Sequence, residues 1–431
     1  MPVVRITELS SHVDERVTVR GWVVTTRSSG KIAFLVLRDG FGYLQAVLPR
    51  KEVTDEAWEA FQSLTQETSL AVTGVVRADA RAPGGFELTA DGLTVLGPSV
   101  DYPITPKEHG TSYLFEHRHL WLRSRRQVAI ARVRHEVVQG IRDFFYERDF
   151  TLVDTPILTG AIGEDAGNLF ATEYFDLGRA YLAQTGQLYA EAAAAALGRV
   201  YCFGPTFRAE KSKTRRHLTE FWMVEPEVAF ADSNDNMRLQ EDFVTSIVAR
   251  VLDRRAEDLA ALERDTAPLE RVAPPFPRLS YSEAVERLNA LGSDIRWGKD
   301  LGGDDETILA EQYDRPVFVY NYPKEVKAFY MKENPEDPRT VLGNDCLAPE
   351  GYGEIIGGSQ REDDYDRLKA RIIEQGLDPA AYDWYLDLRR YGTFVHSGFG
   401  LGVERTVAWI CGNPHIRESI AFPRQIHRLH P

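Results

Sequence analysis

The segment 201–230 joins two apolar runs through a loop that is almost entirely charged. The runs Tyr201–Phe207 and Glu220–Phe230 predict the two strands of a hairpin. The loop carries these charged side chains: Arg208, Glu210, Lys211, Lys213, Arg215, Arg216 and His217. Because arginine offers phosphate oxygens a fixed fork of donors, this hairpin tip suits a polyphosphate ligand. A solvated basic loop is the alternative, and the loop alone does not decide between the two.

Two carboxylates further along the chain are of the kind that binds magnesium. Asp345 and Glu354 lie in two strand-like runs on either side of a turn. Mg²⁺ takes oxygen ligands, keeps several waters and bridges phosphates, so paired acids beside a polyphosphate site suit it. Paired acids at a turn are often only solvated, and this reading stays open as well.

A glycine-rich run, GFGLGVER at residues 398–405, leads into a predicted helix with Arg405 in its first turns. A dinucleotide-binding loop would also place glycines before a helix. That alternative fails because only 29 residues follow Gly402, and no acidic residue ends a second strand about 20 positions on.

Three segments of the chain are similar to the signature motifs of one enzyme family. FGPTFRAE…RHLTEF resembles motif 2 of the class II aminoacyl-tRNA synthetases, GFGLGVER resembles motif 3, and Arg118–Pro156 resembles motif 1. The resemblance extends over nearly the whole chain and is closest to the aspartyl/asparaginyl subgroup, especially its asparaginyl branch. It implies activation of L-asparagine by ATP to the asparaginyl-adenylate, followed by transfer to tRNA(Asn).

The resemblance also assigns roles around the nucleotide. Arg208 would hold the α-phosphate and Arg405 the γ-phosphate, and these two are the expected catalytic residues. The remaining expected ATP-binding residues are Glu210, His217, Phe221, which would stack on adenine, and Glu354. Glu354 and Asp345 would bind Mg²⁺. The amino-acid carboxylate is already charged, so catalysis would consist of positioning and of neutralising phosphate charge.

Four residues are expected to bind the amino acid: Glu164, which matches the family glutamate for the α-ammonium group, and Gln187, Glu225 and Arg361. Arg361 would donate to the oxygen of the asparagine amide and Glu225 would accept from its nitrogen. Aspartate would bring a carboxylate against Glu225, a repulsive contact. The aspartyl branch has a lysine where this chain has Ala190, and its absence favours a neutral amide. A structural role for Glu225, paired with a nearby arginine, is the alternative.

The order of these segments predicts an α+β protein. Residues 1–100 read as five short strands and one helix, which suits a closed OB-type barrel. Residues 101–117 read as a hinge or linker. Residues 118–431 are expected to form an antiparallel sheet flanked by helices, with an insertion around 233–314. The Gly- and Asp-rich part of that insertion, 292–314, is expected to be exposed and without chemistry.

An aromatic side chain in the barrel could stack on the bases of single-stranded nucleic acid. Phe34, together with Arg27, Lys31 and Gln45, could form such a platform, whereas a core-facing phenylalanine is the alternative. By the resemblance the barrel binds the anticodon, with Phe34 on its middle base and Gln45 at the edge of that base.

Composition limits the setting in which the protein works. A net charge of −14 argues against indiscriminate coating of nucleic acid, although a local basic track is compatible with it. Three widely spaced cysteines, no apolar run of about 18 residues and no signal peptide predict a cytoplasmic protein without a membrane segment. Motif 1 implies a homodimer, and a helix packed only within its own domain is the alternative.

Three other functions are compatible with the same motifs. One is an aspartyl-tRNA synthetase of relaxed specificity. Another is a synthetase-derived paralogue that makes asparagine from aspartate and ammonia without tRNA, although such an enzyme has no use for an anticodon-reading barrel. The third is an RNA-binding protein with an inactive catalytic fold, against which the retained Arg208, Glu354 and Arg405 argue.

Overall fold

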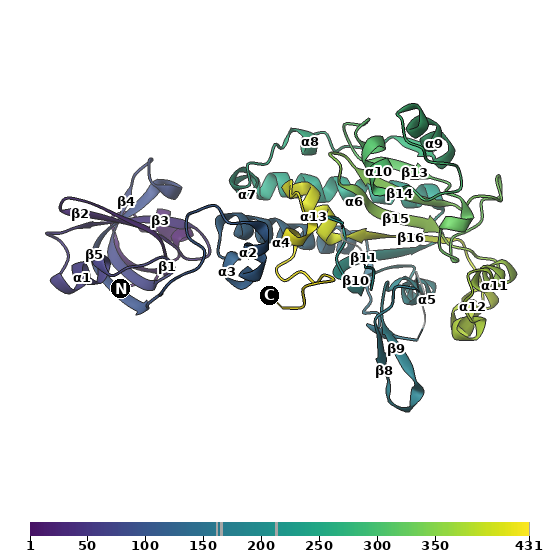
Figure 1. Cartoon of the computed structure of the whole chain (residues 1–431), viewed down its shortest axis with the longest axis horizontal. Helices are drawn as coiled ribbons and strands as arrows, with labels where there is room; N and C mark the ends of the chain where they lie inside the picture. The colour runs from purple at the N-terminus through teal and green to yellow at the C-terminus, as the bar shows by residue number, and fades with distance from the viewer. Residues whose placement is uncertain (161–162, 164–166, 212–213, 431) are drawn as a thin grey trace. The chain divides into compact units, whose positions relative to one another are not determined.

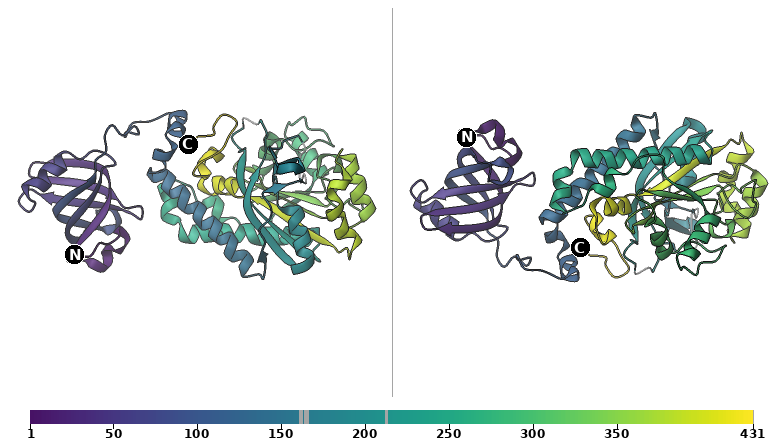
Figure 2. Two further views of the ribbon diagram at one scale, coloured as in Figure 1. Left: turned by 90° about the horizontal axis from the view of Figure 1, so that it is seen from below. Right: turned by 90° about the horizontal axis from the view of Figure 1, so that it is seen from above.

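The computed structural model describes residues 1–160, 163, 167–211 and 214–430. The chain divides into two compact units, Met1–Thr111 and Ser112–Pro431 (Figures 1 and 2). The division falls inside the segment expected to be a linker. That segment ends earlier than expected, because helix α2 (Thr111–Glu116) begins within it and buries Phe115.

The first unit is a closed barrel with strand order β1-β2-β3-β5-β4. The strands are β1 (Arg16–Ser29), β2 (Ile32–Arg38), β3 (Tyr43–Pro49), β4 (Ser69–Ala78) and β5 (Phe86–Gly97), and helix α1 (Asp55–Gln62) lies between β3 and β4. Buried and more exposed residues alternate along β4, as a strand with one face inside a barrel requires. The predicted OB-type barrel is confirmed.

The second unit is built on an eight-stranded sheet of order β12-β13-β14-β15-β16-β11-β10-β6. Its strands are β6 (Thr151–Leu152), β10 (Arg199–Phe207), β11 (Glu220–Ala229), β12 (Arg278–Ser280), β13 (Val317–Tyr320), β14 (Gly343–Ala348), β15 (Gly353–Gln360) and β16 (His396–Gly402). The pairs from β13 to β10 are antiparallel, and only the two edge pairs are parallel. The α+β class is therefore confirmed.

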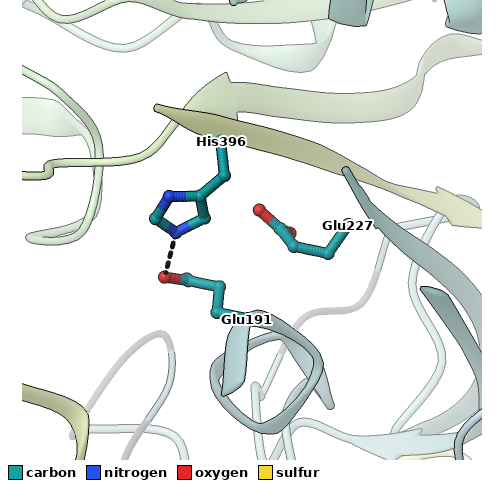
Figure 3. A group of neighbouring side chains, drawn as sticks. All are labelled: Glu191, Glu227 and His396. Atoms are coloured by element: carbon teal, nitrogen blue, oxygen red, sulfur yellow. Dashed lines mark hydrogen bonds and ion pairs between the residues drawn. The ribbon is translucent and has the colours of Figure 1, made fainter. Parts of the chain in front are cut away.

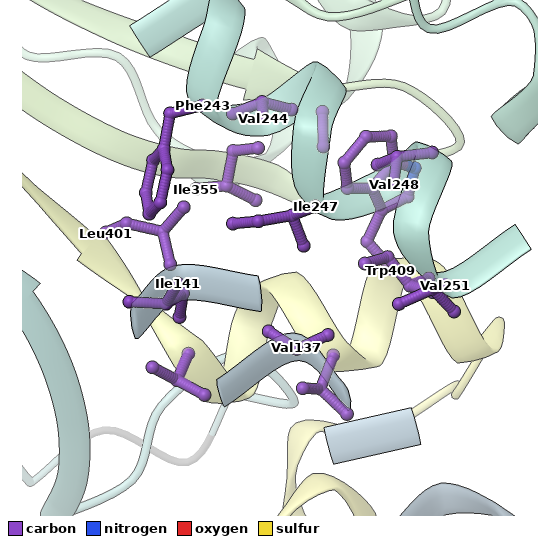
Figure 4. Packing of buried hydrophobic residues seen from close by; sticks show 14 of the residues in the cluster. Val137, Ile141, Phe243, Val244, Ile247, Val248, Val251, Ile355, Leu401 and Trp409 are labelled. Carbon is purple, nitrogen blue, oxygen red and sulfur yellow. The ribbon is translucent and has the colours of Figure 1, made fainter. Parts of the chain in front are cut away.

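Three helices bury one side of this sheet: α4 (Arg125–Tyr146), α6 (Ser233–Arg254) and α13 (Val403–Cys411). Figure 4 shows their apolar side chains packed together, including Val137 and Ile141 of α4, Ile247 of α6 and Trp409 of α13. The carboxylate of Asp232 caps α6 by accepting from the backbone N–H groups of Asn234 and Asp235. By packing on the sheet, these helices hold β15, β16 and the start of α13 in place. The polar residues of these three segments belong to the candidate site.

The expected insertion around 233–314 is wrong in two places. Helix α6 belongs to the central core, where Phe243 and Val251 are fully buried. Residues 292–314 are not simply exposed, because Ile295, Leu301 and Leu309 are buried with α9 (Tyr281–Ala290) and α10 (Gly303–Ala310) in a second core. The apolar residues of this segment are few and are separated by Gly and Asp, so they form no periodic pattern in the sequence.

A small three-stranded sheet of order β7-β9-β8 follows the motif 1 region. It consists of β7 (Leu158–Thr159), β8 (Ala171–Glu173) and β9 (Arg179–Leu182), and it leads into α5 (Gln187–Leu197). Helices α11 (Tyr365–Glu374) and α12 (Asp383–Arg390) form a separate layer at the end of the sheet next to α5 (Figure 1). Within the described ranges, no helix has both the length and the apolar character that crossing a bilayer requires.

Candidate active site

The predicted motif 2 hairpin is present and regular. Strands β10 and β11 pair without interruption from Arg199 opposite Val228 to Phe207 opposite Glu220. The loop then closes with a hydrogen bond from the backbone N–H of Arg208 to the carbonyl of Thr219, 3.0 Å. Lys213, one of the loop cations, lies outside the described residues.

Arg208 lies at the mouth of this hairpin beside Phe221. Its guanidinium carbon lies 5.3 Å from the centre of the Phe221 ring, on the neighbouring strand. Its Nε is buried and has no hydrogen-bond partner among the residues that the structure describes. A buried charged donor without a partner is costly unless a ligand completes it, so this atom suits an anionic ligand.

Arg405 and Glu354 meet although 51 positions separate them in the chain. Arg405 Nη1 donates to the backbone carbonyl of Glu354 and lies 3.9 Å from its carboxylate Oε2. Strand β16 brings them together, because it pairs with β15 on one side and ends where α13 begins. A side-chain pair of this kind depends on strand register and cannot be read from spacing along the chain.

Charged residues from separate parts of the chain affect the pKa of His217. Burial lowers the pKa of His217, the positive charges of Arg405 and Arg208 lower it further, and Glu210 and Glu354 oppose the shift. Glu210 Oε2 lies 3.9 Å from Nε2 of His217. Residues from motif 2, motif 3 and the predicted metal strands therefore face one shared region.

The two expected metal carboxylates share one face of the sheet. A Cβ built on Gly357 would lie 2.9 Å from Glu354 Oε1 and 3.6 Å from Asp345 Oδ1, so both oxygens surround this glycine. The other oxygen of Asp345, Oδ2, accepts from Lys327 Nζ at 2.8 Å. Burial raises the pKa of Asp345 to about 6, Lys327 opposes that shift, and the charge of Glu354 adds to it.

Sequence reasoning missed a third carboxylate beside this pair. Glu306, on α10, accepts the backbone N–H of Glu354 at 3.1 Å and lies 3.4 Å from Arg216 of the motif 2 loop. Burial and then the charge of Glu354 raise the pKa of Glu306 to about 7. Nothing in the run GDDET distinguishes Glu306 from a solvated acid, so only the folded chain reveals it.

Arg216 contacts α10 and the turn between β14 and β15. Its guanidinium donates to the carbonyl of Gly303 at 2.9 Å, to the hydroxyl of Thr307 and to the carbonyl of Gly351. These bonds, with the ion pair to Glu306, attach the motif 2 loop to the edge of the site. In this structure Arg216 therefore holds the motif 2 loop against neighbouring segments, and its guanidinium is not free to bind phosphate.

The described residues that are expected to bind the amino acid lie near the contact between β11 and α5. One oxygen of Glu225 accepts from the hydroxyl of Thr185, and the other accepts from the N–H of Gly186 at 2.8 Å. Arg361 forms a two-point ion pair with Glu227, both distances 2.9 Å. Gln187 joins the same buried region from α5, and Glu164 lies outside the described residues.

A buried group links these residues to strand β16. Glu191 on α5, Glu227 on β11 and His396 on β16 point toward one another (Figure 3). Their ligand atoms lie within 4.8 Å of one another. No sequence pattern connects Glu191 with His396, because 205 positions separate them.

The barrel presents Phe34 on its outer face. Its neighbours in β2, Ala33 and Leu35, are fully buried, whereas Phe34 is only half-buried, which overrules the core-facing alternative. The guanidinium of Arg27 lies 4.4 Å from the Phe34 ring centre, and Gln45 donates to Glu87 at 3.2 Å. Lys31 is exposed in the turn between β1 and β2. Arg27, Phe34 and Gln45 therefore lie on one side of the barrel.

Comparison with known families decides which enzymes share this arrangement. Residues 111–426 match the model described as tRNA synthetases class II (D, K and N), and residues 17–96 match the OB-fold nucleic acid binding domain. The chain belongs to the class II tRNA synthetases. This synthetase is 58% identical to the asparagine–tRNA ligase of Chloroflexus aurantiacus, with 100% of this chain and 99% of the relative covered.

Solved structures agree over the whole length of the synthetase. Asparaginyl-tRNA synthetase from Pyrococcus horikoshii in complex with asparaginyl-adenylate has a TM-score of 0.97 and 47% identity, over 99% of both chains. The asparaginyl-tRNA synthetase of Entamoeba histolytica, also with asparaginyl-adenylate, has a TM-score of 0.91 and 31% identity, over 100% of this chain and 99% of the other.

Proposed function

We propose that this class II synthetase is an asparagine–tRNA ligase, which converts L-asparagine and ATP to asparaginyl-adenylate and transfers the amino acid to tRNA(Asn). The observation that carries the proposal is the end-to-end similarity to enzymes of that name, at 58% identity. The site supports it, because Arg208 and Phe221 meet at the motif 2 hairpin and the buried Glu225 lies on the same strand as Phe221.

In the first step the carboxylate of asparagine attacks the α-phosphorus of ATP, the P–O bond to pyrophosphate breaks, and pyrophosphate leaves. Arg208 would hold the α-phosphate and Phe221 would stack on adenine, as their adjacent positions allow. Arg405 would exchange its contact with Glu354 for the γ-phosphate, and Glu210 and His217 would line the nucleotide site. Positioned cations that neutralise developing charge supply the acceleration.

Magnesium fits the carboxylates of Glu354 and Asp345. Glu354 Oε1 and Asp345 Oδ1 face the same side of Gly357, and hard oxygen donors of this kind suit Mg²⁺. Lys327 holds only the other oxygen of Asp345, so Oδ1 is not engaged in that pair. When bound, the ion would neutralise phosphate charge next to Arg405.

The part of the site that binds the amino acid would recognise the carboxamide through one donor and one acceptor. A guanidinium has five N–H groups, and Arg361 uses three of them on Glu227 and Ser359. One of the remaining N–H groups would donate to the amide oxygen of asparagine, and Glu225 would accept from its nitrogen. Ala190, fully buried on α5, leaves no cation there for a substrate carboxylate. The α-ammonium group would be bound by Glu164.

In the second step the terminal ribose hydroxyl of the tRNA attacks the adenylate carbonyl carbon, and AMP leaves as its bond to that carbon breaks. The barrel would hold the anticodon, with its middle base stacked on Phe34 and read at its edge by Gln45. Arg27 and Lys31 would neutralise nearby phosphates. The contact of Arg27 with Phe34 supports a combined stacking and cationic platform.

We also infer a homodimer and a cytoplasmic location. A groove of about 430 Å³ runs beside α4 and is lined by apolar residues that include Leu122, Ile130, Trp222 and Ile420. Such a groove on the motif 1 helix suits the dimer that the family resemblance implies. The three cysteines are buried and unpaired, in keeping with a reducing compartment.

Amino-acid-dependent exchange of pyrophosphate into ATP tests the activity directly. The purified enzyme is expected to support exchange with asparagine and to charge tRNA(Asn). Equal exchange with aspartate would instead favour the relaxed aspartyl enzyme. Formation of asparagine from aspartate and ammonia without tRNA would favour the paralogue, and absence of any exchange would leave only an RNA-binding role.

A further inference from the structure

A buried group of charges surrounds Arg361, which is proposed to bind the amino acid, and the central carboxylate of this group has no assigned role. Its centre is Glu191, which is completely buried on α5. Its neighbours come from β11, β16, α12 and the residue that follows β15, so four distant segments converge on one carboxylate. Figure 3 shows two of these neighbours, Glu227 of β11 and His396 of β16.

Glu191 accepts hydrogen bonds from several directions. Arg389 Nη2 donates to its Oε2 at 2.8 Å, and the hydroxyl of Tyr385 lies 2.7 and 2.8 Å from the two oxygens. His396 Nε2 lies 2.9 Å from Oε2, and Gln187 Nε2 donates to Oε1 at 3.1 Å. The nearby cations overcome the effect of burial and lower the pKa of Glu191.

His396 also contacts Glu191. Its Nδ1 lies 2.9 Å from the carbonyl of Phe394 and its Nε2 faces Glu191. The group contains two guanidinium cations, Arg361 and Arg389, and they face two carboxylates, Glu191 and Glu227.

The same atoms do not form a metal site. Both oxygens of Glu227 are engaged by Arg361 at 2.9 Å, and Oε2 of Glu191 is engaged by Arg389 and His396. A metal ion would have to displace two buried guanidinium groups from their carboxylates. The cluster is an ion-pair network.

We propose that Glu191 is a positioning residue that determines specificity: its buried negative charge balances the cations around Arg361, so that the pocket accepts a neutral carboxamide and gains nothing from a carboxylate. The inference rests on the proposed function. Arg361 is the connection, because its Nε lies 4.0 Å from Glu191 Oε1 while it would also contact the side chain of the amino acid. Without the charge of Glu191 the network carries one excess positive charge, which aspartate would neutralise.

Glu191→Gln tests the proposal, because it keeps the shape of the side chain and removes its charge. A substrate carboxylate bound to Arg361 would lie roughly 8 Å from Glu191, where the interaction of two charges at an effective dielectric constant near 20 corresponds to about a thirty-fold preference. In pyrophosphate exchange the ratio of kcat/KM for asparagine over aspartate is therefore expected to fall about thirty-fold. Exchange by the unaltered enzyme with asparagine tests the proposed function separately.

Glu136→Gln is the matched control. Glu136 is also buried and pairs with three arginines, Arg250, Arg254 and Arg255, but it does so between α4 and the C-terminal part of α6. This variant is expected to lower the melting temperature and to leave the selectivity ratio unchanged. An equal shift of the ratio in both variants, or an equal loss of both amino acids in Glu191→Gln, would overturn the proposal.

If Glu191→Gln does not accumulate as folded protein, Arg389→Gln changes the charge in the opposite direction. Removing this cation leaves Glu191 in excess, so the rejection of aspartate is expected to become stronger. A selectivity ratio that stays the same or falls in Arg389→Gln would refute the role of charge balance.

Discussion

Replacing Lys327 by methionine should weaken the catalytic unit in a way that depends on pH. The Lys327 side chain is 14% exposed, and its Nζ lies 2.8 Å from Asp345 and 3.9 Å from the centre of the Tyr322 ring. Lys327→Met keeps most of the aliphatic stem and removes the charge. Asp345 would then be left beside Glu354 and Glu306 without its cation.

The magnitude follows from the burial of this pair. Removing one partner of a buried ion pair costs about 3–5 kcal/mol of unfolding free energy. For a unit of this size each kcal/mol corresponds to about 2 °C, which gives a decrease of about 6–10 °C in the melting temperature near pH 8. Added Mg²⁺ should restore part of that loss, because the ion would replace the missing positive charge near Asp345.

The pH dependence has a definite sign. The pKa of Asp345 is raised to about 6 by burial, so the folded state holds this proton more tightly than the unfolded chain does. The resulting stabilisation is present below about pH 4 and is lost as the pH rises through about 6. Without Lys327 the pKa rises further, and an ionised Asp345 becomes still more costly. The loss in Lys327→Met is therefore expected to be larger at pH 8 than at pH 5.

Thermal unfolding of both proteins at pH 5 and pH 8, with and without Mg²⁺, measures this effect. Lys324→Met is the matched control, because Lys324 lies 3.7 Å from Glu333 in a pair whose side chains are about 30% exposed. Such a pair contributes about 0–1 kcal/mol. A Lys327→Met protein that melts like the control at pH 8, or loses the same stability at both pH values, would refute the reasoning.

Three further changes test the proposed roles. Phe34→Ala should raise the KM for tRNA about 5- to 150-fold, because base stacking contributes about 1–3 kcal/mol, and it should not affect pyrophosphate exchange. Phe41→Ala is the control, because it removes another exposed barrel aromatic with an arginine nearby, and it should change neither quantity. Arg405→Gln should reduce kcat for exchange about 10²- to 10³-fold, and a small effect would exclude a role in the transition state. Glu225→Gln should raise the KM for asparagine about 10- to 100-fold and admit aspartate; unchanged discrimination would refute its acceptor role.

Local sequence patterns determined the elements of this protein but not all of their partners. Short apolar runs separated by turn or loop residues predicted the barrel and the hairpin of β10 and β11, because each signal lies within a few neighbouring residues. The family motifs identified Arg208 and Arg405 as candidates for one triphosphate. The same patterns failed for residues 292–314, where a few apolar residues among Gly and Asp pack into a core.

Tertiary structure alone decided which charges meet. Glu191 and His396 are 205 positions apart, and Glu306 reaches Glu354 from a helix whose acids look like any solvated run. These contacts depend on the order and register of strands in the sheet, which no local period encodes. Their consequence is physical: a buried charge is tolerated only beside its counter-charge, so the sheet topology fixes how Lys327, Arg361 and Arg389 pair around the proposed site.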